Sequence, residues 1–241
     1  MPSNSETGHA KNVANFKDLI THVKSLGAAY KPSKEGLLIA NLEAQHTAAA
    51  ASLLSLAKEM PVYQQAVDAK QAAFAPLNKL VTRALNMFKA SVDNHLEVES
   101  ASSLANKIRG VSKAKPVAPE GEEPVKTIST SQQSDDMLIA NFRAFIEILA
   151  AHAAYEPNEA DLKIASLKTL LASLEEKTAA VTQAQININI ARNNRNSIIY
   201  TEGTGLVDTG ASVKTYVKAA FTPEVANYKP ILSLEFRNPQ K

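Results

Sequence analysis

The sequence Ala-Ala-Tyr-Lys-Pro-Ser at residues 28–33 returns as Ala-Ala-Tyr-Glu-Pro-Asn at residues 153–158, and this recurrence decides the fold. The match continues at the same offset, since leucine, isoleucine, alanine and leucine recur in order within 37–42 and 162–167. Because a Tyr-x-Pro turn followed by this pattern is not a low-complexity feature, it predicts an internal duplication. Further matches are Ala14-Asn15-Phe16 with Ala140-Asn141-Phe142, Phe74 with Tyr200, and Leu80-Val81 with Leu206-Val207.

Both copies predict the same order of helices. A first helix is expected at about 12–26 and 135–151, where Ser134 supplies an N-terminal cap for the second of these. The proline of each Tyr-x-Pro turn ends that helix, because the residue before a proline is pushed out of the α region. A last helix is expected at about 77–91 and 206–220.

The second helix of each copy is the longest element that the pattern predicts. Apolar or small residues recur every three or four positions from Leu38 to Leu77, with Gln45 and Lys70 as polar exceptions. The same phase continues across Pro61, so we expect one helix that passes through this proline. A hairpin that turns near Pro61 is the alternative.

The corresponding region of copy two contains no proline or glycine from Asn158 to Glu202. Isoleucine and asparagine alternate with period two at residues 186–190, as in a strand. The matching region of copy one has a helical pattern, so we predict a helix here too. Copy one then adds a helix at about 94–109, whereas copy two ends in a strand-like stretch at 231–236.

The composition agrees with long helices, because only 8 of the 241 residues are glycine and alanine is abundant. We therefore predict an all-α protein in which two pseudo-repeated helical units with long helices form an elongated bundle. The expected parts are an N-terminal tail (1–11), helical repeat 1 (12–109), a flexible linker (110–134), helical repeat 2 (135–222) and a C-terminal tail (223–241).

The charge and the cysteine content exclude several classes of function. The formal net charge is only +2, which gives no reason to expect nucleic acid as a partner. No cysteine is present, so disulfides and thiolate metal sites are excluded. The longest uncharged runs are too short and too polar for a membrane span, and we expect a cytoplasmic protein.

A search for catalytic and metal-binding residues yields none that we assign, and no cofactor is expected. Glu43-x-x-His46 has the spacing of di-iron bundle proteins, but such sites need a second motif on another helix. The duplication places that second motif at Lys168 and Leu171, which cannot bind a metal. We interpret three other features as structural and not as binding sites: the amide-rich segment 187–196, the Gly203-Thr204-Gly205 loop, and the paired tyrosines Tyr30 and Tyr155.

The pattern resembles a group of uncharacterised bacterial all-helical proteins with the same internally duplicated layout. The resemblance rests on Tyr30-Lys31-Pro32-Ser33-Lys34, on residues 73–83 and on Thr204-Gly205-Leu206-Val207-Asp208. It implies the architecture over most of the chain and implies no activity.

These observations favour a non-enzymatic structural or protein-interaction protein. Its partner would be a protein, including a second copy of itself in a homo-oligomer. The alternative is a membrane-active helical protein that inserts after a conformational change, for which the alanine-rich segment 47–57 is the best candidate. The sequence does not identify the partner or the biological process.

Overall fold

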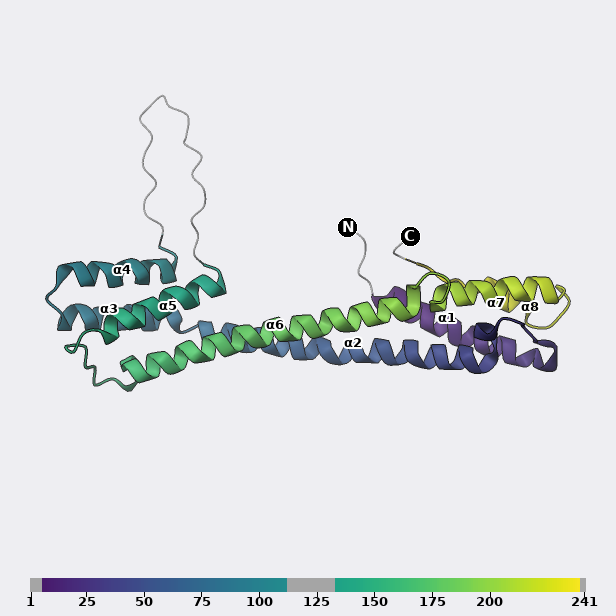
Figure 1. The fold of residues 1–241 in the computed structure, drawn as a ribbon, viewed down its shortest axis with the longest axis horizontal. Helices are drawn as coiled ribbons and strands as arrows, with labels where there is room; N and C mark the ends of the chain where they lie inside the picture. The colour runs from purple at the N-terminus through teal and green to yellow at the C-terminus, as the bar shows by residue number, and fades with distance from the viewer. Residues whose placement is uncertain (1–5, 112–132, 239–241) are drawn as a thin grey trace, which may run out of the picture. The chain divides into compact units, whose positions relative to one another are not determined.

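The computed structural model describes residues 6–111 and 133–238, and this part of the chain is all-α. No strand occurs within those two ranges. Figure 1 shows the helices in chain order. They are α1 (Glu6–Ser25), α2 (Ile39–Phe74), α3 (Leu77–Ser91), α4 (His95–Arg109), α5 (Asp135–Ala150), α6 (Ile164–Tyr200), α7 (Leu206–Ala220) and α8 (Tyr228–Ser233).

The helices are divided between two compact units that combine distant parts of the sequence. Unit 1 contains Met1–Tyr63 and Ala184–Lys241, and unit 2 contains Gln64–Gln183. The units therefore differ from the predicted repeats, 12–109 and 135–222. The reason is the length of α2 and α6, which have 36 and 37 residues. The two ends of such a helix lie many turns apart, so each end packs with different neighbours.

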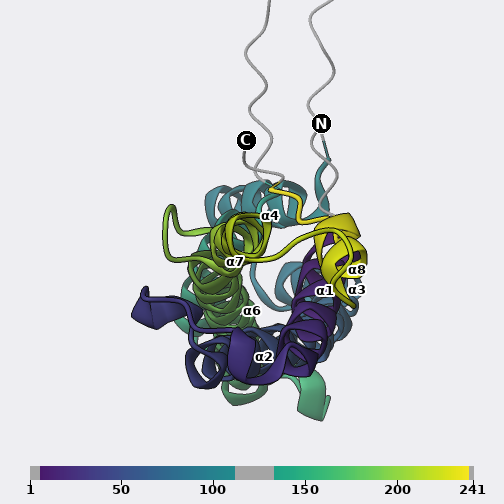
Figure 2. The same cartoon turned by 90° about the vertical axis from the view of Figure 1, so that its right-hand side faces the viewer.

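Unit 1 is built around α1 and α7, with α8 beside both of them. Figure 2 views these helices end-on, with α8 in yellow next to α1 in purple. The apolar residues of α1 recur at intervals of three and four, which places them along one face of the helix. The fully buried side chains of unit 1 include Phe16, Leu19, Val23, Leu42, Ile199, Leu206, Val213, Val217 and Ile231.

Unit 2 has α4 packed against both α3 and α5. Its core contains three fully buried phenylalanines, Phe88, Phe142 and Phe145. Leu167 and Leu174 of α6 complete this core from the first half of that helix. Gly110 ends α4 in the left-handed conformation, at φ 72°, where a side chain would be strained.

Most of the predicted helices are confirmed. The last helices lie at Leu77–Ser91 and Leu206–Ala220 as expected, and α2 continues through Pro61 without a hairpin. The alternating segment 186–190 is helical, as part of α6. Ser134 caps α5, since its hydroxyl accepts a hydrogen bond from the backbone N–H of Met137.

Both predicted tails need correction. Helix α1 already begins at Glu6, and His9 is buried, so residues 6–11 are not a tail. The region predicted as a C-terminal tail contains α8, so residues 231–233 are helical and not strand-like. The prediction failed because Ile231 is buried in unit 1, and tertiary packing overrides a weak local pattern. Most of the predicted linker, residues 112–132, lies outside the described residues.

We predict that the substitution Pro61→Ala stabilises the protein. Within α2, the nitrogen of Pro61 cannot donate a hydrogen bond to the carbonyl of Ala57. A proline inside a helix is less favourable than alanine by about 3 kcal/mol. Restoring the bond should therefore raise the melting temperature by several degrees, which thermal unfolding followed by circular dichroism would measure.

Pro76→Ala is the matched control. Pro76 stands at the start of α3 with a φ of −78°, where the fixed geometry of proline is suitable. This substitution should leave the melting temperature unchanged or lower it slightly, because it adds freedom to the unfolded chain. A lower melting temperature for Pro61→Ala would contradict the account of α2 given above.

Candidate functional site

The paired tyrosines stabilise the two Tyr-x-Pro turns that they begin. The hydroxyl of Tyr30 donates to the carbonyl of Leu37 at 2.9 Å, and that of Tyr155 donates to the carbonyl of Leu162 at 2.9 Å. Burial raises the pKa of both phenols from 10.0 to about 12. This geometry supports the structural interpretation, because each hydroxyl is engaged by the backbone.

The Glu43-x-x-His46 motif lies on the surface of α2, where Glu43 forms an ion pair with Lys24 of α1. Within the described ranges, no three His, Asp or Glu side chains come together in a group that could hold a metal ion. Among the residues that the structure describes, His46 therefore belongs to no set of three such ligands.

The amide-rich segment 187–196 is not a uniform surface. Arg195 is only 5% exposed, and its guanidinium donates to the side chain of Asn196 at 2.9 Å. Arg192, Asn193 and Asn194 are exposed. The sequence did not indicate that an arginine in this segment would point into unit 1.

The Gly203-Thr204-Gly205 loop has its backbone groups occupied by protein atoms. The N–H of Gly203 donates to the carboxylate of Asp208 at 2.8 Å, and the N–H of Gly205 donates to the carbonyl of Thr201 at 2.7 Å. The carbonyl of Thr204 accepts from the side chain of Gln45 at 2.8 Å. These contacts close the loop, and they agree with the view that it is no phosphate site.

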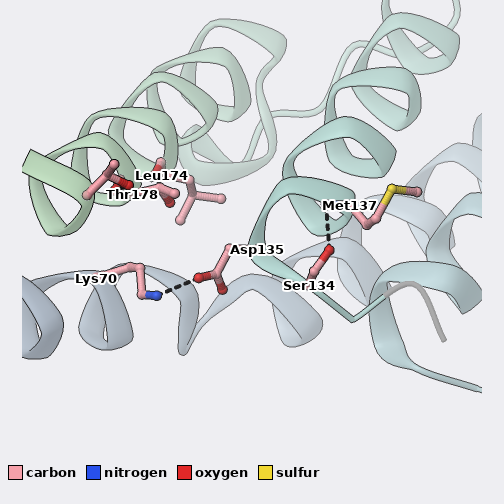
Figure 3. Close-up of polar contacts among 7 residues, drawn as sticks. Lys70, Ser134, Asp135, Met137, Leu174 and Thr178 are labelled. Carbon is pink, nitrogen blue, oxygen red and sulfur yellow. Dashed lines mark hydrogen bonds and ion pairs between the residues drawn. The ribbon is translucent and has the colours of Figure 1, made fainter. Parts of the chain in front are cut away.

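The two polar exceptions in the pattern of α2 both form contacts to another element. Gln45 contacts the loop just described, in unit 1. In unit 2, the ammonium of Lys70 lies 2.5 Å from the carboxylate of Asp135 at the start of α5 (Figure 3). A polar side chain at an inward position is stabilised when it has a partner, and both residues meet this requirement.

The long helices of unit 1 expose large apolar side chains. Ile186 and Ile190 of α6 are 45% and 62% exposed, whereas Ile188 between them is buried against Leu56 of α2. In a helix, residues two positions apart lie on nearly opposite sides, and residues four apart share a side. The alternating sequence therefore gives α6 one apolar face inside and a second one outside. Leu54 and Val62 are similarly exposed on α2.

A further site lies on α1 and α7 and holds the C-terminal arm, which we define as residues 228–238. Asn12 of α1 is 2% exposed and forms two hydrogen bonds with the backbone of Arg237. Its amide donates to the carbonyl at 2.7 Å, and its carbonyl accepts from the N–H at 3.0 Å. Asn15 donates to the carbonyl of Glu235 at 2.7 Å, and Lys214 of α7 donates to that of Leu234 at 2.6 Å.

The arm is anchored by one aromatic ring. Phe236 packs edge-to-face against Phe16, with ring centroids 6.3 Å apart. On the other side it lies against Gly210 of α7, where a Cβ would come within 2.7 Å of the ring. Together with Asn12, Asn15 and Lys214, Phe16 and Gly210 form what we call the arm site. Sequence reasoning missed this site, although the strand-like pattern near residues 231–236 was its one visible signal.

No protein-family model matches the chain, and no curated protein or solved structure is significantly similar to it. Among the helices of the described ranges, none is long and apolar enough to cross a membrane.

We predict that Tyr30 and Tyr155 make stability depend on pH above pH 10. Their pKa is about 12 when folded and 10.0 as the reference value, so the unfolded state loses these protons first. Their stabilisation is complete below pH 10 and is lost as the pH rises from 10 to 12. Urea unfolding at several pH values should show that the free energy of unfolding falls less between pH 10 and 12 in the variant Tyr30→Phe/Tyr155→Phe than in the wild type.

At pH 7 each single Tyr→Phe substitution should destabilise the protein by about 0.5–1.5 kcal/mol, because it removes one hydrogen bond. Tyr63→Phe is the control, since the ring of Tyr63 is only half-buried against the Leu56 cluster. If the free energy of unfolding falls equally between pH 10 and 12 in the wild type and the double variant, the two tyrosines do not cause the loss of stability.

Proposed function

We propose that this chain is a non-enzymatic protein-interaction protein. It binds its partners, a second copy of itself included, through apolar side chains exposed on its long helices. The observation that carries the proposal is the outward face of α6 in unit 1, where Ile186 and Ile190 stand one turn apart and exposed. We call these two residues the α6 face.

Several features support this reading. Single exposed apolar residues are common in soluble proteins, but two β-branched residues on one face, opposite a buried face of the same helix, form a stripe. Leu54 and Val62, about two turns apart on α2, add apolar surface to the same unit. Apolar stripes on helices are the surfaces that partner helices cover, because burial removes them from water.

The chain is made of two copies of one helical unit, each with a first helix, a long helix and a last helix. The equal turn bonds support this, since each tyrosine hydroxyl reaches the carbonyl seven residues further on at the same distance. The equal lengths of α3 and α7, 15 residues each, and the similar lengths of α2 and α6 support it too.

We predict that Ile186→Lys/Ile190→Lys abolishes or strongly reduces self-association. The wild type should form species larger than the 25.9 kDa monomer as its concentration rises. Two lysines would place charges in a contact that excludes water, and such charges are costly to bury. Light scattering coupled to size-exclusion chromatography would measure the change, and circular dichroism would verify the fold.

Leu96→Lys is the matched control, because Leu96 is 75% exposed but belongs to α4 in unit 2. It should leave association unchanged. The proposal is wrong if the wild type stays monomeric at all concentrations, or if the double variant associates as the wild type does. Leakage of dye from lipid vesicles on addition of the protein would favour the membrane-active alternative instead.

A further inference from the structure

The arm site recognises the C-terminal arm mainly through its backbone. Asn12, Asn15 and Lys214 form four hydrogen bonds with the arm, and all four involve main-chain atoms of residues 234–237. A side-chain amide that binds both the N–H and the C=O of one residue acts as a neighbouring strand would, and it holds the segment extended. The site therefore has the chemistry of a receptor for an extended peptide.

Side chains of the arm alternate between the site and the solvent. Leu234, Phe236 and Asn238 are half-buried, whereas Glu235 and Arg237 are exposed. The two exposed residues pair with each other at 2.8 Å, and this hydrogen bond from Arg237 lowers the pKa of Glu235. An extended segment with alternating burial, and one aromatic anchor against Gly210, is how peptides bind in trans.

A single short connection joins the arm to the rest of unit 1. Helix α7 ends at Ala220, and the chain turns at Asn227, which has a φ of 68°. A left-handed conformation is uncommon for a residue other than glycine and stores some strain. Here it is held by contacts to α1, with the Asn227 side chain bonded to His22 at 2.8 Å and to Ser25 at 2.6 Å. A change of backbone angles at this one turn would release the arm as one segment, which could then form the same contacts in the site of another copy.

We infer that the arm site is a binding site for an extended peptide, and that its partner is the C-terminal arm of a second copy of this chain. The arm of each copy binds its own site in the monomer and the site of its neighbour in the assembly. Such an exchange preserves the four hydrogen bonds that Asn12, Asn15 and Lys214 form with the arm, and it relieves the left-handed turn at Asn227. Exchange of an identical element between copies is a low-cost route to association for this reason.

This inference rests on the proposed function only in taking a protein as the partner. It names a second copy as that partner and a contact surface that does not include the α6 face. The two can therefore fail separately.

Two full-length variants test the inference, because each removes one half of the contact. Phe236→Ala removes the aromatic anchor and weakens the hold of the arm on its own site, so that the site can accept the arm of another copy. Gly210→Ala would place a methyl group 2.7 Å from the ring of Phe236, so the ring must shift and the site binds an arm more weakly. Alanine is also a better helix former than glycine, so α7 should stay folded in this variant. Circular dichroism would verify both folds.

The experiment mixes the two variants, both carrying Ile186→Lys/Ile190→Lys to remove association through the α6 face, and uses sedimentation velocity. Each variant alone should be monomeric. The mixture should form a one-to-one dimer, in which the arm of the Gly210→Ala copy occupies the site of the Phe236→Ala copy. In the control mixture, the arm donor carries Phe236→Ala as well. The dimer of the first mixture should form with an affinity at least about tenfold higher than that of the control dimer, because it buries the apolar area of one more phenyl ring.

A folded, monomeric mixture would overturn the inference, and so would a dimer that forms equally well with the donor lacking Phe236. Neither result would bear on the α6 face, which is tested by comparing the association of the wild type with that of Ile186→Lys/Ile190→Lys. The opposite outcome has two parts: the complementary mixture forms a dimer, and Ile186→Lys/Ile190→Lys without further substitutions associates as the wild type does. These results would support the arm site and refute the α6 face.

Discussion

The length of α2 and α6 is the constraint on which the rest of the structure depends. Each helix runs without interruption for 36 or 37 residues, so it cannot bury its apolar face against the helices that follow it in sequence. The two ends of each helix instead belong to different compact units. Unit 1 therefore combines α1 with α7, which lie far apart in the sequence, and unit 2 combines α3 and α4 with α5.

Polar groups make these pairings specific. His9 at the start of α1 bonds to the hydroxyl of Tyr200 at the end of α6, at 2.7 Å, within unit 1. Asp135 at the start of α5 pairs with Lys70 near the end of α2, within unit 2. In both units, the start of a shorter helix meets the last turns of a long helix that is distant in the sequence. His9 and Tyr200 are buried, and a buried polar group without its partner costs free energy, so their contact disfavours other arrangements.

A different element packs against the main helix pair in each unit. In unit 2 the 15-residue helix α4 packs against α3 and α5, and its buried face contributes Ala101, Ala105 and Ile108 to the core. In unit 1 the corresponding role falls to the short helix α8 and the extended residues after it. Helix α4 contributes three buried residues to its core, whereas α8 contributes one, Ile231. The arm is therefore the more easily exchanged of the two segments. This difference is why we place a peptide site in unit 1 alone.

The sequence by itself determined the helices, because their signals are local. The last helices were expected at about 77–91 and 206–220, close to the observed α3 and α7. Ser134 marked the start of α5, and the phase across Pro61 predicted a continuous α2. Local signals cannot say which helix ends meet, since the contact between Asn12 and Arg237 spans 225 positions. For the same reason the tails were misjudged, the burial of Arg195 was unforeseen, and the arm site was visible only as a weak alternation. The tertiary structure alone decided the division into units, because that depends on how the ends of long helices find partners far away in the chain.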